Sequence, residues 1–190
     1  APADVFASAD QIQMDRARTA GRIEGVDAPF ARNRLVIITP ANNPAGITSP
    51  ADLAKPGVKL VTSQPDVPIG VYTQNMLDKM SQDPQLGADF RDKANGNILS
   101  QEANVRQIVS KVQLGEADAG VVYKSDVTPQ SAPQLATIDI PDAFNTIATY
   151  PIATVQNAPD LTAGTAFIAF VLSPAGQEIL GKWNFVPAVQ

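Results

Sequence analysis

The sequence contains neither cysteine nor histidine among its 190 residues. Disulfide bridges, thiol nucleophiles, Ser-His catalytic triads and the usual zinc ligand sets are therefore excluded. Basic residues are also scarce, because 14 lysines and arginines stand against 19 acidic residues, giving a formal net charge of −5. No basic run stands out, so bulk electrostatics does not favour binding to nucleic acid or to an anionic membrane.

What the chain does contain is enough apolar sequence for a core. Hydrophobic residues make up 44% of it, which argues against intrinsic disorder. Strands are expected at 4–8, 34–39, 58–62, 98–99, 117–123, 135–138 and 152–155. Helices are expected at 11–20, 69–81, 105–114, 161–172 and 174–183. Because short strands alternate with helices, the sequence predicts an α/β fold with parallel sheets.

Three positions follow strands in this pattern and could bind a ligand. Pro68 begins a helix whose first backbone N–H groups, including that of Ile69, lack intrahelical acceptors. Gly70 has no Cβ, so a ligand could approach the backbone there. A second helix begins at Val105, and Tyr123 ends a third strand. Ligands of such sheets bind outside the carboxyl ends of the strands, where helix N-termini point.

Together these groups would make a site composed of donors. Helix N-termini carry partial positive charge and suit anions, and a phenol adds one hydroxyl donor. A protonated anion such as hydrogen phosphate would lack an acceptor for its proton, at a cost of about 1–3 kcal/mol. The pattern therefore favours a fully deprotonated dianion such as sulfate or molybdate. The alternative is two ordinary strand-to-helix turns and a core tyrosine. No paired carboxylates or Ser–Lys pair stands at a useful spacing, so we do not expect an enzyme.

Six segments resemble, in order and spacing, the molybdate-binding proteins that serve ABC importers. These segments are APADVFASAD (1–10), VPIGVY (67–72), EANVR (102–106), GVVYKSD (120–126), YPIA (150–153) and LSPAGQ (172–177). The resemblance implies a two-lobe periplasmic-binding-protein-like fold with parallel or mixed sheets. It also implies a periplasmic or extracytoplasmic location and an ABC transporter permease as partner. The ligand would be molybdate or tungstate, held by the backbone N–H groups of Ile69 and Val105 and the hydroxyl of Tyr123, with no cofactor or metal ion.

The same resemblance implies a division into lobes. Residues 37–152 would form one complete α/β lobe, and residues 1–36 with 153–190 the remainder of the other. The family's chains begin well before APADVF, so we expect the first lobe to be incomplete and truncated, without its two serine-bearing turns. Binding would then be weakened. The alternative is a non-catalytic ligand-sensing or interaction module of the same fold that no longer binds molybdate.

An incomplete lobe should expose strand edges and apolar surface, which natural proteins usually cover. Candidate residues of that surface are Phe6, Leu35, Phe167 and Phe170. We expect a second copy of the chain to cover it, forming a homodimer.

Overall fold

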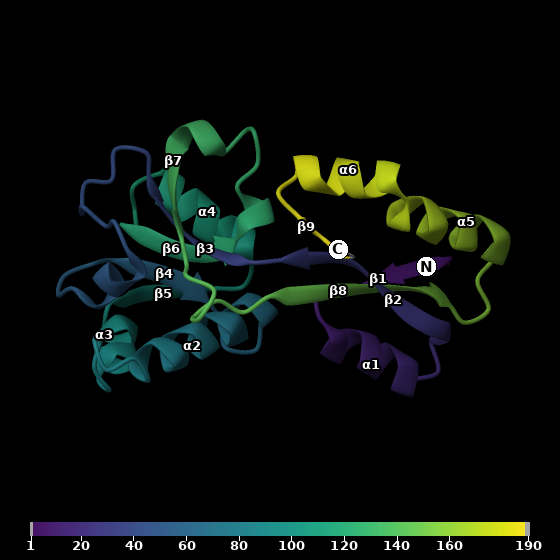
Figure 1. The fold of residues 1–190 in the computed structure, drawn as a ribbon, viewed down its shortest axis with the longest axis horizontal. Coiled ribbons are helices and arrows are strands. Elements are labelled where there is room, and N and C mark those ends of the chain that lie inside the picture. Colours follow the sequence, from purple (N-terminus) through teal and green to yellow (C-terminus); the bar gives the residue numbers. More distant parts are fainter. Residues whose placement is uncertain (1, 189–190) are drawn as a thin grey trace. The chain divides into compact units, whose positions relative to one another are not determined.

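The computed structural model describes residues 2–188. Ala1, the first residue of the APADVFASAD segment, and residues 189–190 lie outside the described part. The chain folds into two units (Figure 1). The larger unit is Arg34–Thr146, and the smaller unit combines residues 1–33 with 147–190. These boundaries differ from the expected ones at 37 and 152. The strand Leu35–Pro40 already pairs within the larger unit at Leu35, whereas the strand Ala148–Val155 pairs within the smaller unit from Ala148 onward.

A mixed five-stranded sheet forms the centre of the larger unit. Its strands are β3 (Leu35–Pro40), β4 (Leu60–Ser63), β5 (Ile98–Glu102), β6 (Ala119–Tyr123) and β7 (Leu135–Asp139). Their order is β5-β4-β6-β3-β7. β4 runs parallel to both β5 and β6, whereas β3 is antiparallel to β6 and β7. The α/β prediction is confirmed, and the sheet is mixed.

Helices cover both faces of this sheet. They are α2 (Pro68–Ser81), α3 (Phe90–Gly96), α4 (Val105–Gln113) and the short 3-10 turns η1 (Pro50–Ala54), η2 (Lys124–Asp126) and η3 (Ala132–Gln134). α4 packs on one face through Ile108, Val109 and Val112, and α2 and α3 lie on the other (Figure 1). A methyl group at Gly120 would lie 2.6 Å from the Cγ2 atom of Ile108, so this glycine lets α4 approach β6. Leu35 is fully buried in this unit, so the prediction that it is exposed is wrong.

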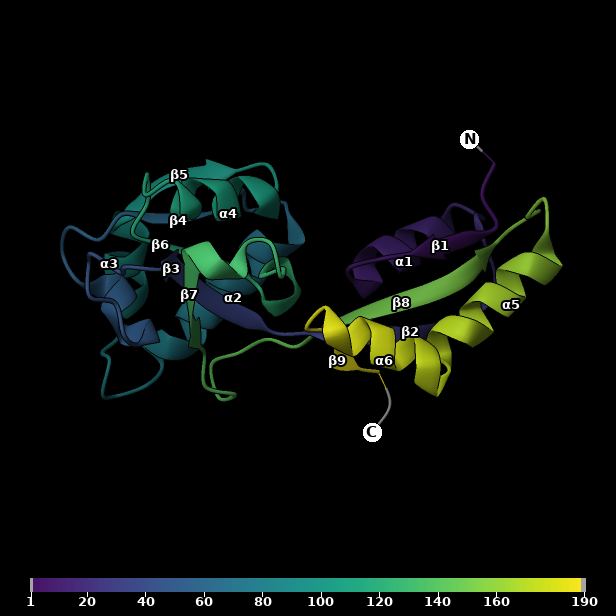
Figure 2. The same ribbon diagram turned by 90° about the horizontal axis from the view of Figure 1, so that it is seen from above.

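The smaller unit contains an antiparallel four-stranded sheet. Its strands are β1 (Val5–Ala7), β2 (Ile23–Asn33), β8 (Ala148–Val155) and β9 (Val186–Pro187), in the order β1-β8-β2-β9 (Figure 2). α1 (Gln11–Thr19) packs on one face, where Met14 meets Ile23 and Ala153. α5 (Leu161–Leu172) and α6 (Pro174–Lys182) cover the opposite face (Figure 1).

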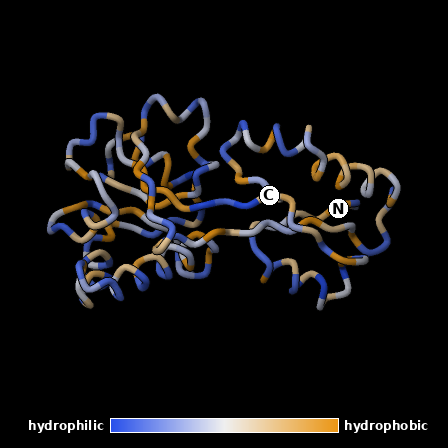
Figure 3. Tube along the Cα trace, in the orientation of Figure 1, coloured by the Kyte–Doolittle hydropathy of each residue, from blue (hydrophilic) through white to orange (hydrophobic). Residues whose placement is uncertain are grey.

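The helices α5 and α6 leave apolar surface exposed. Hydrophobic residues run along α5 (Figure 3), and the side chains of Phe167 and Phe170 are 54% and 50% exposed, as expected. They line an apolar groove of about 310 Å³ with Phe30 and Ile152 of the sheet. Phe6, by contrast, is partly buried against the cluster of Met14, Ile23 and Ala153. Within residues 2–188 no single helix meets the length and hydropathy of a membrane span; α5 and α6 do so only as a pair bent by 66°.

Candidate functional site

The three predicted positions lie at one edge of the larger unit's sheet. β4, β5 and β6 are neighbouring parallel strands, so their carboxyl ends point the same way. The helix α2 follows β4, α4 follows β5, and Tyr123 is the last residue of β6 (Figure 1). This is the edge at which parallel sheets place their ligands.

Ile69 stands in the first turn of α2. Pro68 occupies the first helical position, where its missing N–H is no loss. The N–H groups of Gly70 and Val71 both donate to the carbonyl of Val67, at 2.8 and 3.1 Å. The N–H of Ile69 makes no hydrogen bond to another residue of the described chain, and the Ile69 side chain is fully buried. The residue therefore offers its amide while its side chain packs in the core.

Gly70 has a different role from the one expected. A methyl group built on its Cα would lie 2.1 Å from the carbonyl oxygen of Gln64 and 3.0 Å from that of Ser63. The space that a Cβ would need is thus filled by the backbone that enters the same turn. The glycine allows the turn to fold tightly on itself, and the expectation that it admits a ligand is wrong.

Val105 begins α4 behind a capped turn. The Asn104 side chain accepts the N–H of Gln107 at 3.2 Å, and the Gln107 side chain accepts the N–H of Ala103 at 3.2 Å. These two bonds satisfy donors on both sides of Val105. The N–H of Val105 itself donates to no residue between 2 and 188, and its side chain packs against the core on the α4 face.

Tyr123 is almost fully buried at the end of β6, with 7% of the residue exposed. Its ring meets that of Tyr72 edge-on, with centroids 6.3 Å apart and planes inclined by 73°. Tyr72 belongs to α2, so the first two turns of that helix and the end of β6 are in direct contact. Tyr123 also donates its backbone N–H to the Asp126 carboxylate at 3.1 Å.

Asp126 lies close both to Tyr123 and to the first turn of α4. Burial raises the pKa of its carboxyl to about 6, while the Tyr123 N–H and the positive charge of Arg106 act in the opposite direction. Arg106 follows Val105 in the first turn of α4, so its charge lies within range of the carboxyl. The first turns of both helices therefore lie near the end of β6, at the same edge of the sheet.

A hydrogen-bonded link that the sequence analysis missed joins the two amide-bearing loops. The Ser63 hydroxyl and the Gln64 N–H both donate to the main-chain carbonyl of Glu102, at 2.8 and 3.0 Å. The link connects residues about forty positions apart in the sequence, so no local spacing could have predicted it. It fixes the end of β4 to the end of β5, just before the two helices begin.

A Ser–Lys pair does occur in the structure, although none was expected. The Lys111 ammonium lies 2.9 Å from the Ser100 hydroxyl and 2.5 Å from a Glu102 carboxylate oxygen. Lys111 and Ser100 together hold the pKa of Glu102 below its usual range. A Ser–Lys dyad needs a neutral amine as base, whereas this carboxylate favours the ammonium form. The cluster is therefore a hydrogen-bonded ion pair with no visible catalytic geometry.

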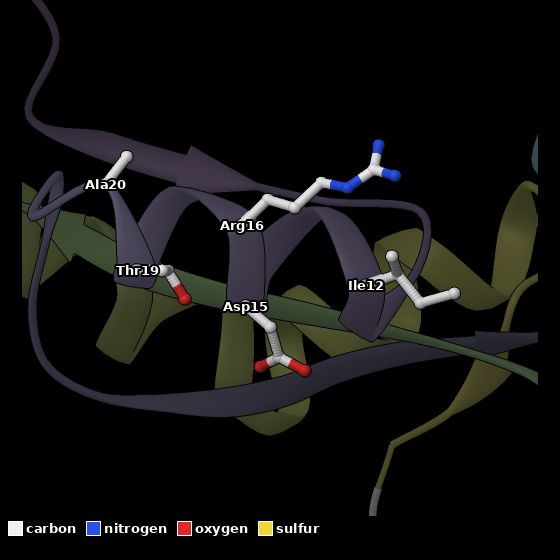
Figure 4. Close-up of a pocket in the computed structure, with 5 residues that line it drawn as sticks. All are labelled: Ile12, Asp15, Arg16, Thr19 and Ala20. Carbon is white, nitrogen blue, oxygen red and sulfur yellow. The ribbon is translucent and has the colours of Figure 1, made fainter.

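In the described chain, neither an acidic cluster nor the hollow on α1 indicates another site. Residues 2–188 contain no group of three or more acidic side chains that could hold a metal ion. A surface hollow on α1 is lined by residues of that helix and its C-cap (Figure 4). These residues are Ile12, Asp15, Arg16, Thr19 and Ala20. They show no convergence of polar groups from different elements, so the hollow is not a candidate site.

Comparison with known proteins gives consistent matches over nearly the whole chain. The family model described as bacterial extracellular solute-binding protein matches residues 1–186. The molybdate-binding protein ModA of Mycobacterium tuberculosis (strain ATCC 25618 / H37Rv) is 36% identical over 185 residues, which cover 97% of this chain and 66% of that protein. The chain thus spans just under two thirds of the length of this curated relative.

Solved structures share the fold. The substrate-binding domain of a putative molybdenum ABC transporter from Clostridium difficile has a TM-score of 0.77 at 25% identity, covering 98% of this chain and 78% of that one. The sulfate-binding protein SubI from Mycobacterium tuberculosis H37Rv has a TM-score of 0.84 at 20% identity, covering 98% and 69%. At that identity the second likeness concerns the fold alone.

Proposed function

Since this chain belongs to the family of bacterial extracellular solute-binding proteins, we propose that it binds a tetrahedral oxyanion, molybdate or tungstate, without catalysing a reaction. The observation that carries the proposal is the convergence of two helix N-termini and one tyrosine at a single sheet edge. In this proposal the N–H groups of Ile69 and Val105 and the hydroxyl of Tyr123 donate to the anion.

The donor set accounts for the proposed choice of anion. The backbone amides can only donate, the phenol donates its hydroxyl proton in this role, and the nearby Asp126 carboxylate lies against the backbone N–H of Tyr123. A dianion without protons can accept from every donor, whereas a proton on hydrogen phosphate would go unpaired at a cost of about 1–3 kcal/mol. The preference for molybdate over sulfate rests on the names of relatives. Tungstate is included as a tetrahedral dianion of the same kind, and the donors themselves suit all three.

The proposed biological role is that of the solute-binding component of an ABC importer. The likeness to the substrate-binding domain of the putative molybdenum ABC transporter from Clostridium difficile supports it. In this role the chain acts in the periplasm or outside the cytoplasmic membrane and delivers its anion to a transporter permease. No cofactor or metal ion takes part.

Thermal unfolding with different anions tests the binding proposal. Molybdate, tungstate, sulfate and phosphate are compared at matched ionic strength. An anion at 100 times its Kd stabilises the folded state by about 2.7 kcal/mol, which corresponds to roughly 5–10 °C in Tm for a chain of this size. A shift for molybdate and tungstate supports the proposal. No shift with any anion contradicts it and favours an interaction module of the same fold.

We also propose that a second copy of this chain covers the apolar groove between α5, α6 and the sheet. The groove is lined almost entirely by apolar atoms, and Phe167, Phe170 and Ile179 are each about half exposed. A homodimer would bury them. Light scattering after size-exclusion chromatography should give twice the chain mass, and Phe170→Glu should give a monomer, whereas Ile12→Glu on the exposed face of α1 should not. A monomeric wild-type protein would contradict this proposal.

A further inference from the structure

Glu102 connects the two loops that carry the proposed amide donors. It is the last residue of β5, three positions before Val105. Its carbonyl oxygen accepts two hydrogen bonds from the β4–α2 loop, from the Ser63 hydroxyl at 2.8 Å and the Gln64 N–H at 3.0 Å. Ser63 is 2% exposed, so water does not compete freely for this bond. One buried hydroxyl and one carbonyl thus join the starts of both loops.

The carboxylate of the same residue holds α4. It accepts from Lys111 at 2.5 Å and from the Ser100 hydroxyl at 2.7 Å. Lys111 lies six residues after Val105 on α4, and its side chain also donates to Ser100 at 2.9 Å. The Glu102 side chain is only 12% exposed. These contacts therefore fix α4 relative to β5 at Lys111, away from the N-terminus of the helix.

A small anion can use both amides only if their separation is held constant. A hydrogen bond weakens once the donor and acceptor are more than about 3.2 Å apart, so loops that move independently by a few tenths of an ångström lose one donor. Residues outside a binding site that orient the contacting groups commonly change affinity when they are removed.

We propose that Glu102 and Ser63 are positioning residues, which keep the N–H groups of Ile69 and Val105 at the separation that a single oxyanion requires. The inference rests on the proposed function of the site. The inference extends that function, because neither side chain contacts the anion. Both side chains act by holding the backbone of the two loops in place.

The first test needs no anion. ¹H–¹⁵N spectra of the whole chain compare the wild type with Ser63→Ala, Ser63→Thr and Glu102→Gln. Ser110→Ala, at an exposed position of α4, is the matched control. Ser63→Ala should shift the amide signal of Val105, on the opposite loop. Ser63→Thr keeps the hydroxyl and should restore the wild-type signal. An unchanged Val105 signal in Ser63→Ala overturns the inference.

The second test is a titration with sodium molybdate. Ser63→Ala and Glu102→Gln should each raise the Kd about tenfold, while Ser63→Thr and Ser110→Ala stay within about twofold of the wild type. A purely structural role would lower Tm but leave the Kd of the folded protein unchanged, and that result overturns the inference. If the wild type does not bind molybdate, the proposed function fails, and the anion-free spectra still decide whether Ser63 fixes Val105.

Discussion

The substitution Gly70→Ala should disable the proposed site from a position that does not contact the anion. The new methyl group would lie 2.1 Å from the carbonyl oxygen of Gln64, and contacts below 3.0 Å are essentially never found for a Cβ. The backbone must therefore open by about 0.9 Å, and the obstacle is main chain rather than the end of a flexible side chain. The neighbouring Ile69 amide lies in the turn that opens.

The effect on binding follows from this displacement. If the first turn of α2 takes up the whole movement, an amide about 2.9 Å from its acceptor ends near 3.8 Å, beyond hydrogen-bond range. A hydrogen bond to a charged group contributes about 1.5–3 kcal/mol, so the Kd for molybdate should rise by about 10- to 150-fold. Overpacking should also lower the free energy of unfolding by about 1–3 kcal/mol.

Isothermal titration with molybdate and urea unfolding measure the two effects separately. Gly96→Ala is the matched control, because a methyl group at this α3 position meets no atom within 4 Å. That change should leave the Kd unaltered and stabilise the fold by about 0.5–1 kcal/mol. If Gly70→Ala folds and binds molybdate as tightly as the wild type, then either the Gln64 contact or the role of the Ile69 amide is wrong.

Three further changes test other parts of the structure. Tyr123→Phe removes one proposed donor, so the Kd for molybdate should rise by about 10- to 150-fold; an unchanged Kd removes Tyr123 from the site. Asp126 has a folded-state pKa of about 6 against 3.8, so its ionisation costs stability as pH rises from 4 to 6. Asp126→Asn should therefore add up to about 3 kcal/mol at pH 7 and nothing below pH 4, and equal gains at both pH values in urea unfolding would refute this. The Thr62 hydroxyl is buried without a hydrogen bond in the described chain, so Thr62→Val should add about 1–3 kcal/mol; a lower Tm would contradict that.

Local signals in the sequence predicted much of the larger unit. α4 begins and ends where its cap at Asn104, its apolar spacing and Gly115 indicate, and Pro68 marks the start of α2. These features depend on residues within one or two turns of each other. The sharing of one sheet edge by Ile69, Val105 and Tyr123 also follows from a general property of parallel strands.

Longer-range features could not be predicted in this way. β2 was missed because Gly25, with a φ of 69°, and two register shifts break the alternation that identifies a strand. The burial of Leu35 depends on β6 and β7, which lie about a hundred residues away. The role of Gly70 depends on how closely the preceding turn approaches it, and spacing in the sequence does not contain that distance.

The route of the chain has a consequence for the order of folding. Asn33 pairs with Ala148, so the central strands of the smaller unit meet only across the 34–146 segment. While that segment is an open coil, joining its ends carries a large loop-closure entropy. Once the segment has formed its own sheet, its ends are fixed and little of that entropy is left to lose. We therefore expect the inserted unit to fold first and to act as the template on which the split unit assembles.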